Sequence, residues 1–189
     1  MVRIGTIGLV LSLLQIASAQ AADPPPRQME RLGRGLVALH KEDGKVLVSW
    51  RLLGTEPEGV AFNLYRTAGD AAPVKVNPTP LTKATCFEDA IPDVTKPTTY
   101  IVRPIIDGKE GEPSSPFKFP ANPPARPYLA IPLQAPAGYV AGDSSVGDLD
   151  GDGEYEIVVH VTGRGRDNSQ AGTTTEPIFH AYKLDGTRL

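Results

Sequence analysis

Apolar and polar residues alternate in short runs between residues 36 and 118. Val46, Val48 and Trp50 occupy every second position of one run, which places them on one face of a strand. The strand-like runs cover residues 36–39, 46–52, 61–66, 85–89, 99–106 and 115–118. Asp-Gly turn signals at 43–44 and 107–108 separate some of them. The pattern predicts an antiparallel β-sandwich of the fibronectin type, with Trp50 packed in its core rather than stacked on a sugar.

Strand-like runs return near the end of the chain, at residues 144–147, 156–161 and 179–184, and another begins at 187–189. Four antiparallel strands with a turn at each end form one blade of a β-propeller. A blade has to pack against neighbours on both sides, because alone it cannot bury its two faces. The sequence is therefore expected to be the N-terminal piece of a longer protein, with an incomplete first blade in residues 137–189.

The 19 prolines among 189 residues exclude other fold classes. Proline cannot donate a backbone hydrogen bond and is kept out of helix interiors, so helical bundles and parallel α/β domains are disfavoured. Six prolines fall between residues 119 and 136, and only Pro177 follows them. We therefore expect an extended linker over 120–136, after a sandwich domain over 27–119. A net charge of −3 without a basic cluster argues against nucleic acid as a partner.

The first residues have the pattern of a targeting signal. Arg3 precedes an apolar run over residues 4–17, and small residues follow at Ala17, Ala19 and Ala21. A positive start, a short apolar run and small residues at a cleavage site are typical of a signal peptide. We expect residues 1–21 to be this signal and the mature protein to be secreted or periplasmic, without a membrane span. The alternative is an uncleaved membrane anchor.

Cys86 is the only cysteine in the chain, so it cannot form an intrachain disulfide. Its place in a strand-like run predicts a buried structural residue rather than a reactive thiol.

The clearest chemical signal is the acidic loop, residues 148–156. It carries acids at its positions 1, 3, 5, 7 and 9, in order Asp148, Asp150, Asp152, Glu154 and Glu156. Calcium takes six to eight oxygen ligands, which side chains at alternate positions and the carbonyl of residue 154 would supply. Gly153 permits the sharp turn. The alternatives are a magnesium site and a solvated acidic turn without a metal.

This loop does not fit an EF-hand. Position 12 is Val159, where an EF-hand has a bidentate glutamate, and the loop leads into a β-branched run typical of a strand. We therefore expect a calcium loop between β-strands. The predicted fold class is all-β: a fibronectin III-like β-sandwich followed by the first, incomplete blade of a calcium-binding β-propeller.

Several motifs, in order along the chain, resemble the start of bacterial rhamnogalacturonan lyases of polysaccharide lyase family 11. They cover residues 27–30, 34–38, 48–56, 62–66, 145–153, 167–170 and 181–186. The resemblance implies an eight-bladed propeller with many calcium sites after the β domain. It also implies β-elimination in the rhamnogalacturonan I backbone of pectin, in which a cation neutralises the uronate carboxylate and a base removes the C5 proton.

The resemblance also suggests roles for single residues. The acidic loop matches a family calcium site, and Asp143 matches a cleft aspartate that contacts calcium. Arg164 and Arg166 would attract a uronate carboxylate, although a solvated surface loop explains them equally well. Family members often have a sugar-contacting asparagine where this chain has Gly142, which has no side chain to make that contact. The family's base lies in later blades, so the chain alone is expected to be inactive, and His160 and His180 are not expected to replace that base.

Two further functions fit the same layout. A β-sandwich with a calcium-loaded propeller also occurs in non-enzymatic carbohydrate-binding and adhesion proteins. A purely structural module stabilised by calcium is the third reading.

Overall fold

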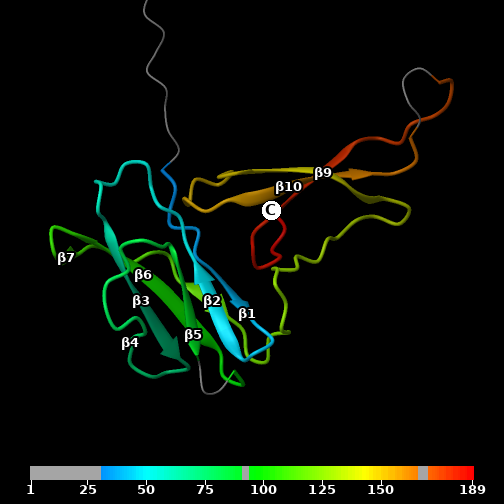
Figure 1. Cartoon of the computed structure of the whole chain (residues 1–189). Helices are drawn as coiled ribbons and strands as arrows, with labels where there is room; N and C mark the ends of the chain where they lie inside the picture. Colours follow the sequence, from blue (N-terminus) through cyan, green and yellow to red (C-terminus); the bar gives the residue numbers. More distant parts are fainter. Residues whose placement is uncertain (1–30, 91–93, 166–169) are drawn as a thin grey trace, which may run out of the picture.

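The computed structural model describes residues 31–90, 94–165 and 170–189. Within these ranges the chain forms eleven strands and no helix, which confirms the predicted all-β class. None of the described residues belongs to a helix suited to crossing a membrane. Figure 1 shows β1 to β7 gathered in one body, from which β9 and β10 extend away. The expected signal peptide, residues 1–21, lies outside the described residues.

The main body consists of two antiparallel sheets. One has the order β1-β2-β5, with β1 (Val37–His40), β2 (Lys45–Ser49) and β5 (Cys86–Ala90). The other has the order β4-β3-β6-β7, and β8 also pairs with β6. Its strands are β3 (Ala61–Ala68), β4 (Val74–Lys75), β6 (Thr98–Ile106), β7 (Lys109–Glu110) and β8 (Phe117–Phe119). Each strand-like run predicted between residues 36 and 118 overlaps one of these strands.

A hydrophobic core fills the space between the two sheets. Side chains from both sheets are fully buried in it, namely Val46, Val48, Leu64, Tyr100 and Val102. Trp50 is 5% exposed and packs edge-on against Phe62, with ring centroids 5.6 Å apart. The prediction that Trp50 belongs to the core is confirmed. The alternation of the sequence thus directs one face of each sheet inward, as a β-sandwich requires.

Asp89 on β5 is a charged residue inside this body and is only 5% exposed. Its two carboxylate oxygens accept hydrogen bonds from Arg66 Nη1 at 2.8 and 2.7 Å, and Oδ2 also accepts one from the Tyr100 hydroxyl at 2.9 Å. Burial is the main cause that raises the pKa of Tyr100, and the nearby carboxylate adds to it. Tyr100 therefore stays protonated and donates. The network joins β5 of one sheet to β3 and β6 of the other.

Cys86 differs from expectation, since its side chain is exposed and forms no disulfide. It begins β5, in which Phe87 is partly buried and Asp89 is buried, while Glu88 is exposed. Successive side chains of a strand point to opposite faces, so the inward positions of β5 are 87 and 89. The strand was predicted correctly, but the prediction that Cys86 is buried was wrong because the residue lies on the outward face.

A separate antiparallel sheet has the order β11-β10-β9, with β9 (Val140–Gly147), β10 (Glu156–Thr162) and β11 (Ile178–Tyr182). Val159, Val161 and Tyr182 are buried on one of its faces, where Ile131 of the linker packs against them. Beyond β11, Arg188 forms a single bridge with Tyr182. The run expected at residues 187–189 therefore begins to pair but does not extend into a fourth strand in the described part of the chain.

The proline-rich segment 120–136 is hydrogen-bonded to both parts of the molecule. The Arg126 N–H donates to the His40 carbonyl at 2.9 Å, and His40 Nδ1 lies 2.9 Å from the Pro123 carbonyl oxygen. The Gln134 N–H donates to the Tyr182 hydroxyl at 2.8 Å. The segment therefore follows the surface of the main body and of the sheet β11-β10-β9 rather than spanning open solvent.

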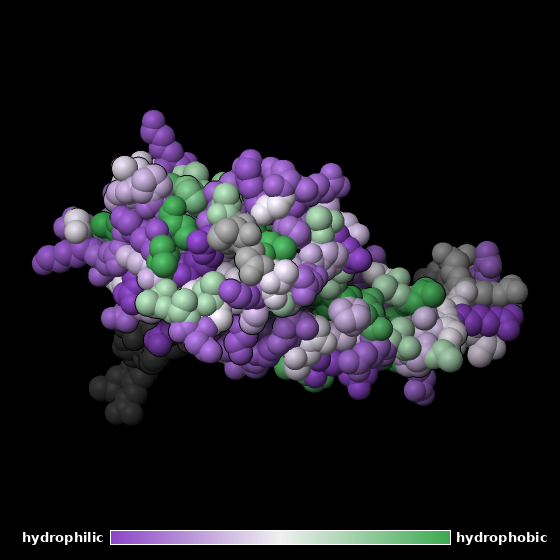
Figure 2. All heavy atoms as spheres, turned by 90° about the horizontal axis from the view of Figure 1, so that it is seen from below, coloured by the Kyte–Doolittle hydropathy of each residue, from purple (hydrophilic) through white to green (hydrophobic). Residues whose placement is uncertain are grey.

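Figure 2 shows a largely polar surface with separate apolar patches, one of them on the narrower end of the molecule.

Candidate metal centre

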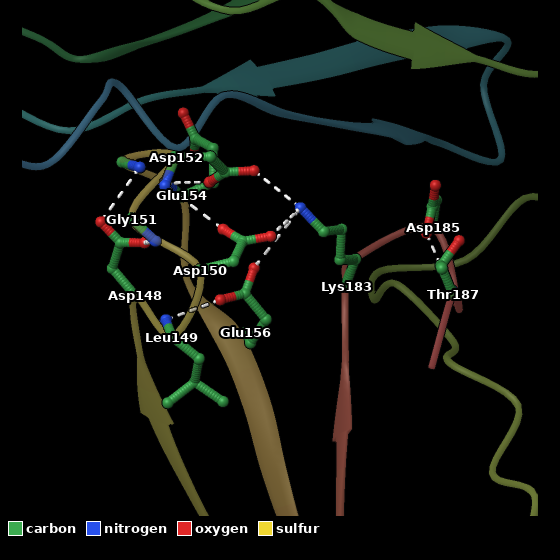
Figure 3. A network of polar contacts seen from close by, with 11 residues as sticks. Asp148, Leu149, Asp150, Gly151, Asp152, Glu154, Glu156, Lys183, Asp185 and Thr187 are labelled. Carbon is green, nitrogen blue, oxygen red and sulfur yellow. Dashed lines mark hydrogen bonds and ion pairs between the residues drawn. The ribbon is translucent and has the colours of Figure 1, made fainter. Parts of the chain in front are cut away.

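The acidic loop connects β9 to β10 and folds around its own carboxylates (Figure 3). Asp148 accepts hydrogen bonds from the N–H groups of Gly151 and Gly153, at 2.8 and 3.0 Å. Asp150 accepts from the Asp152 N–H at 3.2 Å, and Asp152 accepts from the residue 154 N–H at 2.8 Å. The two glycines have φ values of 79° and 88°, a region that favours glycine. The turn therefore needs these glycines, whose N–H groups both donate to the Asp148 carboxylate.

Three carboxylates of the loop converge. Oxygen atoms of Asp148, Asp150 and Glu156 all lie within 4.8 Å of one another. Two oxygens that share a calcium ion at about 2.4 Å each are separated by at most about 4.8 Å, so this spacing fits a single ion. Glu156 is 1% exposed, and its Oε2 accepts a hydrogen bond from the Leu149 N–H at 2.8 Å. The donor set consists of carboxylate oxygens, which are hard ligands that suit calcium.

Asp152, which was also expected in the site, lies beside these three carboxylates, and Lys183 bridges it to them. Lys183 Nζ lies 2.6 Å from Asp150 Oδ2, 2.7 Å from Asp152 Oδ2 and 3.9 Å from Glu156 Oε1 (Figure 3). The hydrogen bond to Asp150, followed by that to Asp152, raises the pKa of Lys183. The same contact lowers the pKa of Asp152. The loop thus holds a protein cation next to its carboxylates.

The side chain of Glu154 faces the sandwich. Its Oε1 accepts a hydrogen bond from the Gly35 N–H at 3.3 Å, and its Oε2 lies 3.7 Å from Arg51 Nη1. Burial raises the pKa of Glu154, while the Gly35 N–H and Arg51 oppose that shift. The carboxylate of this predicted site residue therefore serves the contact between the loop and the sandwich, whereas the predicted metal ligand at position 7 was its carbonyl oxygen.

Arg51 is the centre of that contact. Its Nη1 donates to the carbonyls of Gly33 and Gly153 at 3.1 and 3.4 Å, and its guanidinium lies 4.3 Å from the centroid of the Tyr155 ring. A backbone hydrogen bond of 2.6 Å from the Gly33 N–H to the Gly153 carbonyl runs alongside. The acidic loop is therefore docked on the segment that enters the sandwich and on the residues that follow β2.

We expect Arg51→Met to loosen this contact without unfolding the sandwich. Methionine keeps the apolar stem but loses the guanidinium that contacts both carbonyls, the carboxylate of Glu154 and the ring. Local opening is controlled by such contacts, so a protease should cut linker 120–136 about three- to tenfold faster. The measurement is the rate of limited proteolysis of the folded chain. Arg103→Met is the control, because Arg103 binds Gly111 within the sandwich. Equal rates in both variants would contradict a docking role for Arg51.

The other predicted site residues do not join the carboxylate group. Asp143 lies on β9 with an exposed side chain, and Arg164 is exposed after β10. Arg166 lies outside the described residues. His160 stacks on Phe179 with ring centroids 4.9 Å apart, and His180 Nδ1 lies 3.1 Å from the Tyr182 hydroxyl. Both histidines thus have partners within the sheet.

Sequence reasoning missed Lys183 and Arg51 as parts of the site. Both lie in strand-like runs, whose alternation predicts a strand but not the contacts of its charged side chains. Arg51 is 102 residues from its partner Gly153. The excess of acids over bases in the loop was a signal that a cation must lie nearby, but it did not say which one. The cation is Lys183 because β11 ends beside the loop, and the local sequence does not contain that tertiary contact.

A cleft of about 540 Å³ separates the sandwich from the loop and the end of β11. The sandwich side contributes Leu36 and Lys118, the linker contributes Leu129, and the loop side contributes Tyr155 and Lys183. Lys183 therefore contacts the acidic loop and borders an open space at the same time.

Two family models match this chain. Residues 27–119 match a model described as the rhamnogalacturonan I lyases beta-sheet domain. Residues 128–189 match a model described as the rhamnogalacturonan lyase family 11, C-terminal domain. The second match contains the acidic loop, all of β9 to β11 and Lys183. The two matches follow one another in the chain and leave little of it uncovered after residue 26.

Two curated relatives from Bacillus subtilis (strain 168) are similar to the chain. The rhamnogalacturonan endolyase YesW is 43% identical over 179 residues, and the rhamnogalacturonan exolyase YesX is 39% identical over 178 residues. The alignments cover 89% and 88% of this chain but 27% of each relative. Among solved structures, one titled "Myokine structure" is 14% identical, with a TM-score of 0.39 over 49% of this chain and 98% of that chain. From its two matched models and its similarity to these lyases, the chain belongs to rhamnogalacturonan lyase family 11.

Proposed function

We propose that the protein carrying this chain is an exported, calcium-dependent lyase that cleaves the rhamnogalacturonan I backbone of pectin by β-elimination. The observation that carries this proposal is the 43% identity to a rhamnogalacturonan endolyase over 179 residues. The chain spans about a quarter of that relative's length, so the proposal concerns the whole gene product. Because one relative is an endolyase and the other an exolyase, similarity does not separate the two modes of cleavage.

The metal proposed for the acidic loop is calcium. Asp148, Asp150 and Glu156 would hold it, and Asp152 would join them once its contact with Lys183 is released. A turn crowded with carboxylates suits calcium, whose coordination geometry is flexible, better than magnesium, which prefers a rigid octahedron and keeps several waters. In the proposed reaction a bound cation would neutralise the uronate carboxylate. In this chain the loop's own contribution is to fix the junction of β9 and β10, and a base is proposed to come from outside residues 1–189.

The sheet β9–β10–β11 is proposed to be part of a propeller blade, and the main body to be a fibronectin III-like sandwich. Directly paired residues of antiparallel strands point to the same face. The pairs Thr162–Val140 and His160–Phe179 therefore share the face opposite the buried Val159 and Val161. Val140 is 65% exposed on that face and Phe179 is 66% exposed. A neighbouring blade would cover these apolar side chains, which supports the proposal.

The complete gene product tests the activity. It should release unsaturated uronides from rhamnogalacturonan I, followed by their ultraviolet absorbance, and a chelator should abolish the release until calcium is restored. Polygalacturonan is the control substrate, because its backbone lacks rhamnose, and it should give no signal. Residues 1–189 alone should give none on either polymer. If the gene product binds rhamnogalacturonan I but releases no unsaturated uronides, the lyase proposal fails and the non-enzymatic carbohydrate-binding function is favoured.

The export part of the proposal has its own measurement. Removal of the predicted signal peptide would leave a mature N-terminus after Ala19 or Ala21. N-terminal sequencing of the protein from the culture medium or the periplasm detects this. Retention of residues 1–21 on a cell-associated protein would contradict cleavage and favour a membrane anchor.

A further inference from the structure

Lys183 stands where the acidic loop most needs positive charge. The nine residues 148–156 include five acids and no base. Glu154 is compensated by the sandwich, which leaves four carboxylates on the other side of the loop. Among the ion pairs of the described residues, Lys183 is the cation that contacts Asp150, Asp152 and Glu156. Like charges so close together oppose folding of the turn unless a cation lies among them.

The buried member of the group makes this need strongest. Glu156 is 1% exposed, and a buried carboxylate is costly unless it is paired and hydrogen-bonded. Its Oε2 is bound by the Leu149 N–H, whereas its Oε1 faces Lys183 Nζ at 3.9 Å, beyond hydrogen-bond distance. At that distance the Lys183 ammonium compensates the charge of Glu156 only weakly. A divalent metal ion is smaller than an ammonium group and would lie closer to the same oxygen.

Lys183 uses oxygens that a metal ion would need. Asp150 Oδ1 accepts the Asp152 N–H, and Asp150 Oδ2 is occupied by Lys183 Nζ at 2.6 Å. The two oxygens of Asp152 are occupied in the same manner, by the residue 154 N–H and by Lys183. An ammonium at 2.6 Å and a calcium ion at about 2.4 Å cannot share one oxygen without strong repulsion between the two cations.

From this geometry we propose that Lys183 is a built-in counter-cation of the acidic loop. It keeps the loop folded when no divalent ion is bound, and it competes with that ion and so sets the affinity of the site. This inference rests on the calcium site of the proposed function. Removal of a residue that orients a metal ligand weakens metal binding, whereas removal of the Lys183 ammonium should tighten it.

The lysine has room to leave. Its side chain is 31% exposed and lines the cleft of about 540 Å³ between the loop and the sandwich. Lysine carries its charge on a flexible four-carbon stem, so its ammonium can move into that space without a change in the backbone. Exchange between ammonium and metal therefore needs only a side-chain rotation at the end of β11.

The test compares Lys183→Met with Lys118→Met in the otherwise unchanged chain. Both remove one positive charge from a wall of the same cleft, but only Lys183 contacts the loop carboxylates. Titration calorimetry with calcium should show about tenfold tighter binding for Lys183→Met, from the loss of two partly exposed ion pairs. Lys118→Met should change the affinity by less than about twofold. Lys183→Arg, which keeps the charge, should return the affinity toward that of the unaltered chain.

A second readout covers the state without metal. In chelator, Lys183→Met should melt at a lower temperature than the unaltered chain, and calcium should raise its melting temperature by more. Unchanged or weaker calcium binding by a folded Lys183→Met variant overturns the counter-cation role but leaves the calcium site standing. If neither the unaltered chain nor the variant binds calcium, the proposed site fails, and the competition fails with it. Should the methionine variant not fold, Lys183→Gln is titrated in its place, with the same outcomes.

Discussion

Asp89→Ala is expected to lower the free energy of unfolding of the sandwich by about 3 kcal/mol. The substitution leaves the Arg66 guanidinium without its carboxylate and the buried Tyr100 hydroxyl without its acceptor. Removing one partner of a buried ion pair costs about 3–5 kcal/mol, because the remaining charge stays buried and unpaired. The lower end of that range applies here, since the side chain of Arg66 is 19% exposed and regains some water.

The single tryptophan makes this prediction measurable. Trp50 lies in the core of the sandwich, so its fluorescence in a urea titration reports on that body alone. Tyr100→Phe is the matched control, since it removes only the hydroxyl and should cost about 1 kcal/mol. Two variants with equal midpoints would contradict a central role for the Asp89 carboxylate.

Asp148→Ala is expected to weaken calcium binding by about 100-fold or more. The substitution removes one of the three converging carboxylates together with the acceptor of the Gly151 and Gly153 N–H groups. Loss of a residue that merely orients a metal ligand costs about 10–100-fold in affinity, so loss of a ligand that also shapes the turn costs at least the upper figure. At calcium 100-fold above the unaltered dissociation constant, a stabilisation of about 2.7 kcal/mol would fall to a few tenths.

The experiment measures the rise in melting temperature on addition of calcium, for the unaltered chain and the variant. Asp185→Ala is the control. Its carboxylate accepts the Thr187 N–H at 2.8 Å and lines the same cleft, but it lies outside the converging group. An equal calcium-induced rise in Asp148→Ala would show that the ion binds elsewhere, whereas loss of the rise in both variants would point to a general charge effect.

The strands of this fold could be predicted from the sequence because burial follows residue parity. Val46, Val48 and Trp50 read as one face and are buried as one face. The same parity shows why the prediction for Cys86 was wrong. The run was recognised as a strand, but Asp89 was not considered an inward residue, since only the arrival of Arg66 and Tyr100 from the other sheet makes a buried aspartate tolerable. Pairing across 11 and 23 residues is a tertiary event that no local pattern contains.

The candidate site shows the same division between local and distant contacts. The turn around Asp148 closes through hydrogen bonds no more than five residues apart, and the spacing of acids and glycines was enough to predict it. The loop position of Glu154 predicted a role for its carbonyl oxygen, but it did not indicate that its carboxylate would face Arg51. Lys183 enters from 31 residues beyond Asp152. Contacts within the loop could be derived, but those that cross from β11 or from the sandwich could not.

The glycine pair at the junction limits how this protein can be recombined. A Cβ on Gly153 would lie 2.9 Å from the Arg31 carbonyl oxygen, and one on Gly33 would lie 2.5 Å from Glu154 Oε1. Gly153 is therefore required by its own backbone, with φ at 88°, and by the Arg31 carbonyl of the other module, whereas a side chain at Gly33 would displace the Glu154 carboxylate from the contact. A chimera that exchanges the sandwich with that of a relative has to carry residues 33–35 and 151–155 as a matched set. The proline-rich segment is then not a neutral splice point, and the two modules form a single unit for engineering.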